Sequence, residues 1–536
     1  MNRQTKRLAL VTGAACTVVA LSATVALADR PGTARPGPTT SVAPYVLPVA
    51  DGVDITSLFT VGDRPSGNGY RMVGIPDGLG VLPSGRRTVD VFMNHELGAA
   101  QGKERAHGQT GAFVSRLTID PRTGAVVSGA DLIHKVQYWQ YPTGGYGDAP
   151  VPPAGAAPTS HTPQFSRFCS GALTAPGQLL NRRSGNGYDG QLYFANEESG
   201  DEARAFAVQM DGTAIQLPRL GLFSWENTLA AANRSDTTLV MGNEDSADGQ
   251  LRVYRGTKTR DGSAVDRAGL TNGVLSVIHV ADGAATTDAQ FRATYGKNNP
   301  APVGLSEIDW TKSGSAQNVE AKAEGLGLNR IEDGAFDPRH PNDYYFNTTE
   351  GGDQTAHPEV GGAVRNGGGL WRLSFKDLER PELGGTLTLL LDGSEAPFLN
   401  KPDNMTIDDR GNLLLQEDPG NNASVARIVA YRIADGALGV VAQFDPARFG
   451  APATGQPSFI TQDEESSGIL DVSGLLGRPG TFVFDAQVHK ANPDPGLVEE
   501  GQLLTMTVPN WDRVYGTGGH GDGHGDNEQN GHGRND

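Results

Sequence analysis

Carboxylates recur directly after short apolar strands, in a pattern that suits metal binding. Five segments end in Asn or Gln followed closely by an acid: Asn94-His95-Glu96, Asn196-Glu197-Glu198, Asn243-Glu244-Asp245, Asn347 to Glu350, and Gln416-Glu417-Asp418. For any single segment, the preference of Asn and Asp for turns is a sufficient explanation. The repeated Glu favours a shared site. Buried carboxylates need cations, and calcium accepts several oxygen ligands.

Two further segments contain side chains that could take part in binding or catalysis. Cys169 follows a long loop, between Arg167 and Gly171. A lone cysteine is a core residue, an unwanted reactive thiol or a metal ligand, and without other context the core interpretation is favoured. Arg330 lies two residues before Glu332, so both side chains share one face of an extended strand. A guanidinium beside metal-bound acids is suited to binding phosphate, and a surface ion pair is the alternative.

The elements that position these residues are predicted to be β-strands. The chain has 72 Gly and 33 Pro among 536 residues, and few uninterrupted helical patterns. Hairpins are predicted at 113–127, 208–215, 332–346 and 405–415, each with a turn that contains Asp, Asn or Gly. Their irregular spacing indicates an all-β fold, a β-propeller with degenerate blades and long loop insertions such as 137–166. In a propeller, equivalent strands end on the same side, so the acids would meet at one mouth. Packed β-sheets are the alternative.

The two ends of the chain indicate export. Residues 1–28 combine three positive residues, an apolar stretch and Ala26-Leu27-Ala28, which predicts a cleaved signal peptide; a membrane anchor is the alternative. A Pro-rich leader is predicted at 29–46, a body at 47–515, and a disordered tail rich in Gly, His and Asp at 516–536. Cleavage leaves one of the 2 Cys, so no internal disulfide forms. It also changes the net charge from −18 to −21, which excludes nucleic acid and anionic membrane as main partners.

The order of these motifs resembles the PhoX-type alkaline phosphatases, secreted bacterial enzymes with a calcium and iron cluster on a β-propeller. The resemblance spans roughly residues 50–420 and begins at 73–80, before Asn94-His95-Glu96. It implies that Arg330 contacts phosphate. It also implies a set of metal ligands: Glu96, Cys169, Glu197, Glu198, Glu226, Glu244, Asp245, Glu332 and Asp403. The chain departs from the family in lacking a twin-arginine signal and in having Trp225 where His is usual. Calcium is therefore the expected cofactor, with iron a further candidate.

We expect a secreted, monomeric phosphomonoesterase that releases phosphate from small organic phosphate esters. Two alternatives keep the calcium-binding propeller. One is a hydrolase of the phytase or lactonase type, in which Cys169 has no role. The other is a propeller without enzymatic activity that binds a surface partner.

Overall fold

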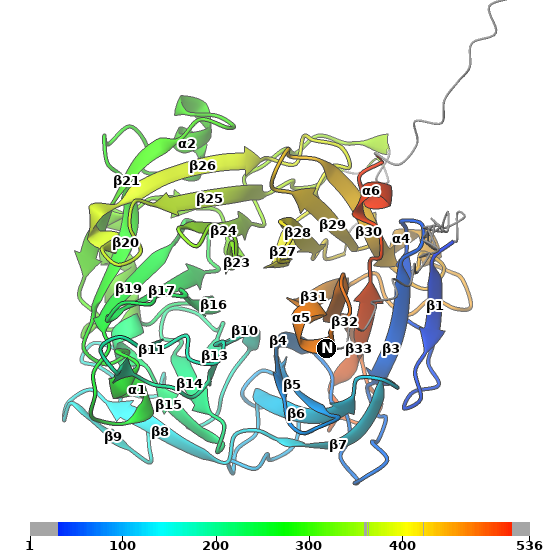
Figure 1. The fold of residues 1–536 in the computed structure, drawn as a ribbon, viewed down its shortest axis with the longest axis horizontal. Coiled ribbons are helices and arrows are strands. Elements are labelled where there is room, and N and C mark those ends of the chain that lie inside the picture. The colour runs from blue at the N-terminus through cyan, green and yellow to red at the C-terminus, as the bar shows by residue number, and fades with distance from the viewer. Residues whose placement is uncertain (1–30, 359–361, 363, 422, 517–536) are drawn as a thin grey trace, which may run out of the picture.

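The computed structural model describes residues 31–516, except 359–361, 363 and 422. These residues form a ring of six blades around a central axis, which confirms the predicted β-propeller (Figure 1). In every blade four antiparallel strands lie side by side, ordered from the axis outward, so the innermost strand of each blade faces the axis.

The strands of each blade follow one another closely along the chain. Listed from the axis outward, they are β4 (Pro76–Pro83), β5 (Val89–His95), β6 (Phe113–Asp120) and β7 (Ala125–Asp131) in blade 1; β10 (Phe168–Leu173), β13 (Leu192–Glu197), β14 (Ala205–Gln209) and β15 (Thr213–Gln216) in blade 2; β16 (Trp225–Ala230), β17 (Thr237–Glu244), β19 (Arg252–Thr257) and β20 (Val274–Val280) in blade 3; β23 (Ile331–Phe336), β24 (Asp343–Thr348), β25 (Gly369–Phe375) and β26 (Gly385–Leu391) in blade 4; β27 (Pro402–Ile407), β28 (Asn412–Glu417), β29 (Arg427–Arg432) and β30 (Leu438–Phe444) in blade 5; and β31 (Glu464–Asp471), β32 (Thr481–Ala491), β33 (Glu499–Thr507) and β3 (Asp54–Thr60) in blade 6.

Blade 6 closes the ring because it combines both ends of the body. Strand β3 from the N-terminal part pairs antiparallel with β33 near the C-terminus, from Asp54 opposite Thr507 to Thr60 opposite Gln502. Two more N-terminal strands extend neighbouring sheets: β1 (Thr33–Pro36) pairs with β3, and β2 (Val46–Pro48) pairs with β30. Most of the predicted leader 29–46 therefore lies against the propeller, because its backbone groups complete two outer sheet edges. The predicted signal peptide and all of the tail except residue 516 lie outside the described residues.

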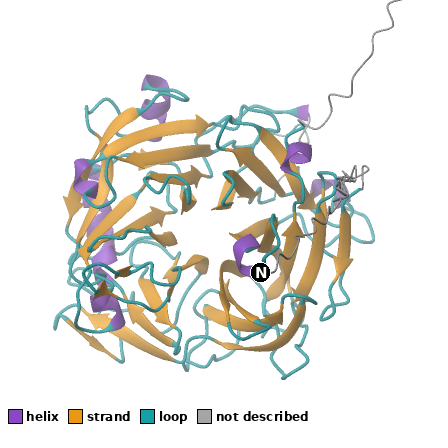
Figure 2. Ribbon diagram, in the orientation of Figure 1, coloured by secondary structure: helices purple, strands orange, loops and turns teal. Residues whose placement is uncertain are grey.

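The insertions add short elements, and most of the helices lie at the periphery of the ring (Figure 2). Part of the loop expected at 137–166 is ordered as β8 (Lys135–Gln140) and β9 (Gly145–Gly147), which extend blade 2. Strand β21 (Ala301–Ile308) joins blades 3 and 4 into one sheet. The remaining elements are β11 (Leu180–Asn181), β12 (Asn186–Gly187), β18 (Gly249–Gln250), β22 (Gly327–Leu328), α1 (Ala264–Arg267), α2 (Asp288–Thr294), α3 (Gly314–Glu324), α4 (Gly450–Ala453), α5 (Ser473–Leu476), α6 (Trp511–Val514), η1 (Pro218–Leu220) and η3 (Pro381–Leu383). No helix in this part of the chain is long and apolar enough to cross a bilayer.

The hydrophobic core is divided among the interfaces between blades. Each pair of neighbouring blades shares one buried apolar cluster, for example the Phe92 and Tyr193 cluster between blades 1 and 2. The other clusters follow around the ring, between blades 2 and 3, 3 and 4, 4 and 5, 5 and 6, and 6 and 1. Burial on both faces explains why the strands contain apolar runs rather than alternating residues. The six innermost strands are thereby fixed around the axis.

Candidate metal centre

The second residue of every innermost strand is a carboxylate or a thiol. These six residues, one from each blade, are Asp77, Cys169, Glu226, Glu332, Asp403 and Glu465. In each blade the residue before it pairs with the second strand, as Pro76 pairs with His95 and Ile331 with Thr348. The six functional groups therefore start at the same level of the axis, at one mouth of the propeller.

The backbone at this level departs from regular strand geometry. Five of the six innermost strands have a register shift immediately after the pairing residue, and in β31 the shift comes at Gly468. In four blades the residue just before the strand has a positive φ: Ile75, Arg167, Arg330 and Lys401, between 50° and 58°. Left-handed backbone is costly for residues with a Cβ, and it persists where surrounding structure enforces it, often at functional sites.

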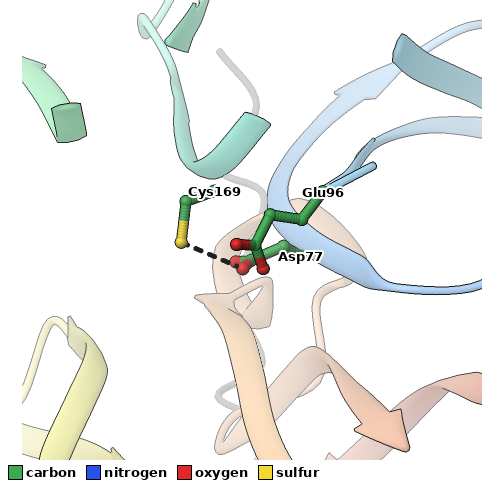
Figure 3. Close-up of side chains that lie close together, drawn as sticks. All are labelled: Asp77, Glu96 and Cys169. Atoms are coloured by element: carbon green, nitrogen blue, oxygen red, sulfur yellow. Dashed lines mark hydrogen bonds between the residues drawn. The ribbon is translucent and has the colours of Figure 1, made fainter. Parts of the chain in front are cut away.

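Three overlapping groups at this mouth have the composition of metal sites. They are Asp77, Glu96 and Cys169; then Cys169, Glu198 and Glu226; then Glu226, Glu332 and Asp403, and in each group the ligand atoms lie within 4.8 Å of one another. Figure 3 shows the Cys169 sulfur facing the carboxylates of Asp77 and Glu96, with Sγ 3.3 Å from an oxygen of Asp77. Because Cys169 and Glu226 each belong to two groups, the arrangement suits several neighbouring cations with shared ligands.

Burial and mutual repulsion make these groups poor anions on their own. Burial raises the pKa of Asp77, with Glu96 adding to the effect, and burial followed by Glu198 raises the pKa of Glu226. The pKa of Glu332 is raised by burial and by Asp245, and burial also raises that of the Cys169 thiol. Such groups bind cations readily, because a cation relieves both the desolvation and the repulsion.

Two arginines supply positive charge at the mouth. Arg330 forms a two-pronged pair with Asp245, through Nε at 2.8 Å and Nη2 at 2.9 Å, and its Nη2 lies 3.3 Å from Glu332. Arg167 contacts Glu96 at 2.6 Å and Glu198 at 2.5 Å, in both cases through Nη2. The two arginines therefore precede the innermost strands of blades 2 and 4, on either side of blade 3, which carries Glu226.

A cavity of about 350 Å³ opens beside these groups at the mouth. His489 lines it and lies 2.7 Å from Glu499 and 3.7 Å from Glu465. Burial alone would lower the pKa of His489, but the two glutamates outweigh it and raise the pKa to about 11. His489 is therefore a cation at neutral pH. The remaining residues of the wall are Ile75, Glu96, Gly98, Gln101, Arg167, Asp418, Glu465 and Glu499.

Hydrogen bonds beneath the acids connect opposite sides of the axis. Ser170 donates to Glu226 at 2.6 Å, and Asn404 of blade 5 donates to the Ser170 hydroxyl at 2.5 Å. Asn227 of blade 3 donates to Asp333 of the neighbouring blade 4 at 2.5 Å. These small polar side chains form a floor that fixes Glu226 in position.

Two of the predicted ligands lie in ion pairs with arginines and outside the three groups. Glu197 lies in a buried ion pair with Arg204, whose Nε is 2.6 Å away, and Glu244 pairs with Arg252 at 3.0 Å. Both glutamates end the second strand of a blade, where Glu197 meets the arginine just before the third strand β14 and Glu244 meets the first residue of the third strand β19. Glu417 repeats the arrangement with Arg427 at 2.6 Å. The excess of Glu at strand ends is therefore explained in part by structural pairs within the blades.

The other predicted residues lie at the mouth. Glu96, Cys169, Glu198, Glu226, Glu332 and Asp403 are the members of the three groups, together with Asp77. Asp245 lies outside the groups and binds Arg330. Asp77, Glu465 and Arg167 were missed as site residues. The signal that identifies Asp77 is its position after Pro76, which matches Pro402-Asp403 in blade 5.

The donor set fits the metals that the sequence suggests. Carboxylate oxygens are suited to calcium, and a thiolate favours a softer ion such as iron. Oε1 of Glu332 is buried and accepts no hydrogen bond, although Nη2 of Arg330 lies 3.3 Å away, and neither buried oxygen of Asp485 on β32 accepts one. Buried carboxylate oxygens of this kind are costly unless a cation or a proton satisfies them.

Comparisons with known proteins find one matching family model and several similar solved structures. The family model of alkaline phosphatase PhoX matches residues 207–470. The solved structure of Pseudomonas fluorescens PhoX in complex with vanadate, a transition state analogue, is similar with a TM-score of 0.55 and 11% identity, over 86% of this chain and 95% of that chain. A putative exo-β-1,3-galactanase from Bifidobacterium bifidum gives a TM-score of 0.32 at 11% identity, covering 72% and 95% of the two chains. Comparison with curated proteins finds no match.

Proposed function

We propose, since the chain is a distant member of the PhoX alkaline phosphatase family, that it is a metal-dependent phosphomonoesterase of the extracellular space. The observation that supports this most is the pairing of three overlapping ligand groups with Arg330 at one mouth. The substrate would be a small organic phosphate ester, which suits a cavity of about 350 Å³. Export is supported by the signal-like sequence of residues 1–28, and we propose that the exported protein is a monomer.

The proposed metal ligands are the members of the three groups, with calcium as the main ion and iron as a candidate for the thiol side. When bound, the cations would neutralise the carboxylates and offset the charge that develops on the phosphoryl oxygens. The chain itself would orient the substrate. Asp245 fixes one edge of the Arg330 guanidinium, through Nε and Nη2, and among the described residues Nη1 of Arg330 donates no hydrogen bond. Nη1 is therefore available to a phosphoryl oxygen.

The experiment is an assay of the full chain on a generic aryl phosphate, with calcium and then with a chelator. We expect activity in the culture medium that the chelator abolishes and added metal restores. Arg330→Ala should lower kcat/KM by about 100-fold or more, as expected for loss of a charge-stabilising donor. Arg182→Ala is the matched control, because that side chain is 74% exposed on a loop of blade 2.

Two outcomes would contradict the proposal. Activity that survives the chelator would remove the metals from the reaction. A metal-loaded protein without any turnover would favour the alternative of a calcium-binding propeller that is not an enzyme. Elemental analysis of the same samples distinguishes calcium alone from calcium with iron.

A further inference from the structure

Arg167 and Arg330 occupy the same position in two different blades. Each is the residue just before an innermost strand, with φ of 51° and 58°. Each carbonyl accepts a hydrogen bond from the backbone of the residue that follows the second strand, Glu198 at 2.8 Å and Thr349 at 2.9 Å. The strained backbone therefore aims both guanidinium groups from the rim toward the mouth.

Arg167 lies at the wall of the cavity proposed for the substrate. Arg167 lines the cavity of about 350 Å³ together with Glu96 and His489. Its side chain is 49% exposed, compared with 33% for Arg330. Within the described part of the chain, Nη1 of Arg167 donates no hydrogen bond, whereas Nε and Nη2 donate to Glu198. The free edge of this guanidinium faces a space that a small anion could enter.

The partners of the two arginines differ in one respect. Arg330 is anchored by its two-pronged pair with Asp245, which belongs to none of the three ligand groups, and its contact with a group member, Glu332, is longer at 3.3 Å. Both acids that bind Arg167, Glu96 and Glu198, are members of those groups. Cations and Arg167 therefore compete for the same carboxylates. When these acids serve cations, they hold the guanidinium less strongly and leave more of its N–H groups for another anion.

We infer that Arg167 is a second substrate-binding residue, which contacts the phosphate group of a monoester from the side of blade 2, with Arg330 on the side of blade 4. This inference rests on the proposed phosphatase function and adds to it a basis for substrate choice. A monoester dianion presents three terminal oxygens and two charges, which two guanidinium groups can share. A diester has two terminal oxygens and one charge, so it gains less from the second guanidinium.

The test uses inorganic phosphate as the probe and the calcium-loaded full chain. Calorimetric titration gives the dissociation constants for phosphate, and elemental analysis gives the metal content. Both are measured for wild type, Arg167→Ala, Arg167→Lys and the control Arg182→Ala. We expect Arg167→Ala to weaken phosphate binding about tenfold or more with its metal content unchanged. The lysine variant should recover part of the loss, and the control should match wild type. In assays, Arg167→Ala should raise KM for an aryl monoester. It should also lower the ratio of kcat/KM for the monoester to kcat/KM for the corresponding diester.

The outcomes separate the inference from the function on which it rests. Wild type that neither binds phosphate nor hydrolyses the monoester contradicts the proposed function. Wild-type binding that persists in Arg167→Ala overturns only the role of Arg167. Loss of metal in both Arg167 variants also overturns it, because Arg167 would then support the carboxylates rather than the substrate.

Discussion

The glutamates of this propeller have two roles, and one position in a blade separates them. A glutamate that ends a second strand meets an arginine of the third strand, as Glu244 meets Arg252. A glutamate that is the second residue of an innermost strand faces other acids, as Glu332 faces Asp245 and Asp403. The first arrangement stabilises the fold. In the second arrangement, burial and the neighbouring acids raise the pKa of Glu332, and a bound cation would relieve that repulsion.

Substitution of these two glutamates by glutamine should therefore have opposite effects. Glu244→Gln leaves Arg252 buried without its carboxylate, so we expect a loss of about 3–5 kcal/mol in the free energy of unfolding, with metal content per folded molecule unchanged. Glu332→Gln removes one of several repelling buried acids, so the chelated protein should be at least as stable as wild type. Its metal content should fall. Urea denaturation with chelator, together with elemental analysis, gives both quantities. Loss of metal in Glu244→Gln alone would contradict the assignment.

At the scale of the strand, an amide near the end of the second strand joins neighbouring blades in four of the blades. Asn94 donates to the carbonyl of Cys169 at 2.6 Å, Asn347 to that of Asp403 at 2.7 Å, and Asn243 to that of Glu332. In blade 5, Gln416 donates to Ser467 in the same way. Each acceptor lies on an innermost strand, at the candidate ligand for the three asparagines and two residues after Glu465 for Gln416. These amides therefore fix the relative positions of ligands that come from different blades.

Removal of one such amide should weaken the packing of two blades. In Asn94→Ala the buried carbonyl of Cys169 loses its donor and the Tyr193 hydroxyl loses an acceptor, which should cost about 1–3 kcal/mol. Chemical denaturation in the presence of chelator measures this without a contribution from metal binding. Asn299→Ala is the control, since its amide bonds to Tyr295 at the exposed surface. An equal loss in both variants would show that Asn94 has no special role between blades.

The sequence predicts the strands and hairpins of this fold better than it predicts their positions within the blades. All four predicted hairpins form, but 113–127 and 208–215 are the third and fourth strands of their blades, whereas 332–346 and 405–415 are the first and second. This difference accounts for their irregular spacing. The acids at strand ends do mark one mouth of the propeller. Which strand lies innermost is decided by packing between blades, so Glu465 could be recognised only after the six strands were aligned on the axis, whereas the match of Pro76-Asp77 to Pro402-Asp403 marks Asp77 in the sequence.

At the scale of the whole molecule, closure of the ring concentrates negative charge at one mouth. Pairing of β3 with β33 completes blade 6 and brings Glu465, near the end of the chain, beside Asp77, near its beginning. Burial and then Glu465 raise the pKa of Asp418 to about 7, and burial raises that of Asp333 to about 6. The closed ring therefore holds acids that prefer to be neutral unless cations are bound.

The stability of the protein should consequently depend on pH in opposite ways with and without metal. An acid whose pKa is raised by folding stabilises the fold fully below its unfolded pKa of about 4, and this contribution is lost as pH rises through the folded value. The chelated protein should therefore lose stability between about pH 4 and pH 7. Calcium binds the ionised carboxylates, so its stabilising effect should grow over the same range, reaching about 2.7 kcal/mol when calcium is 100-fold above its dissociation constant. Thermal unfolding at pH 5, 6, 7 and 8, with calcium and with chelator, measures the difference in Tm. A difference in Tm that stays constant across this range would mean that calcium binds away from the buried acids. A difference that is largest at pH 5 would contradict the expectation that calcium binding strengthens as the acids ionise.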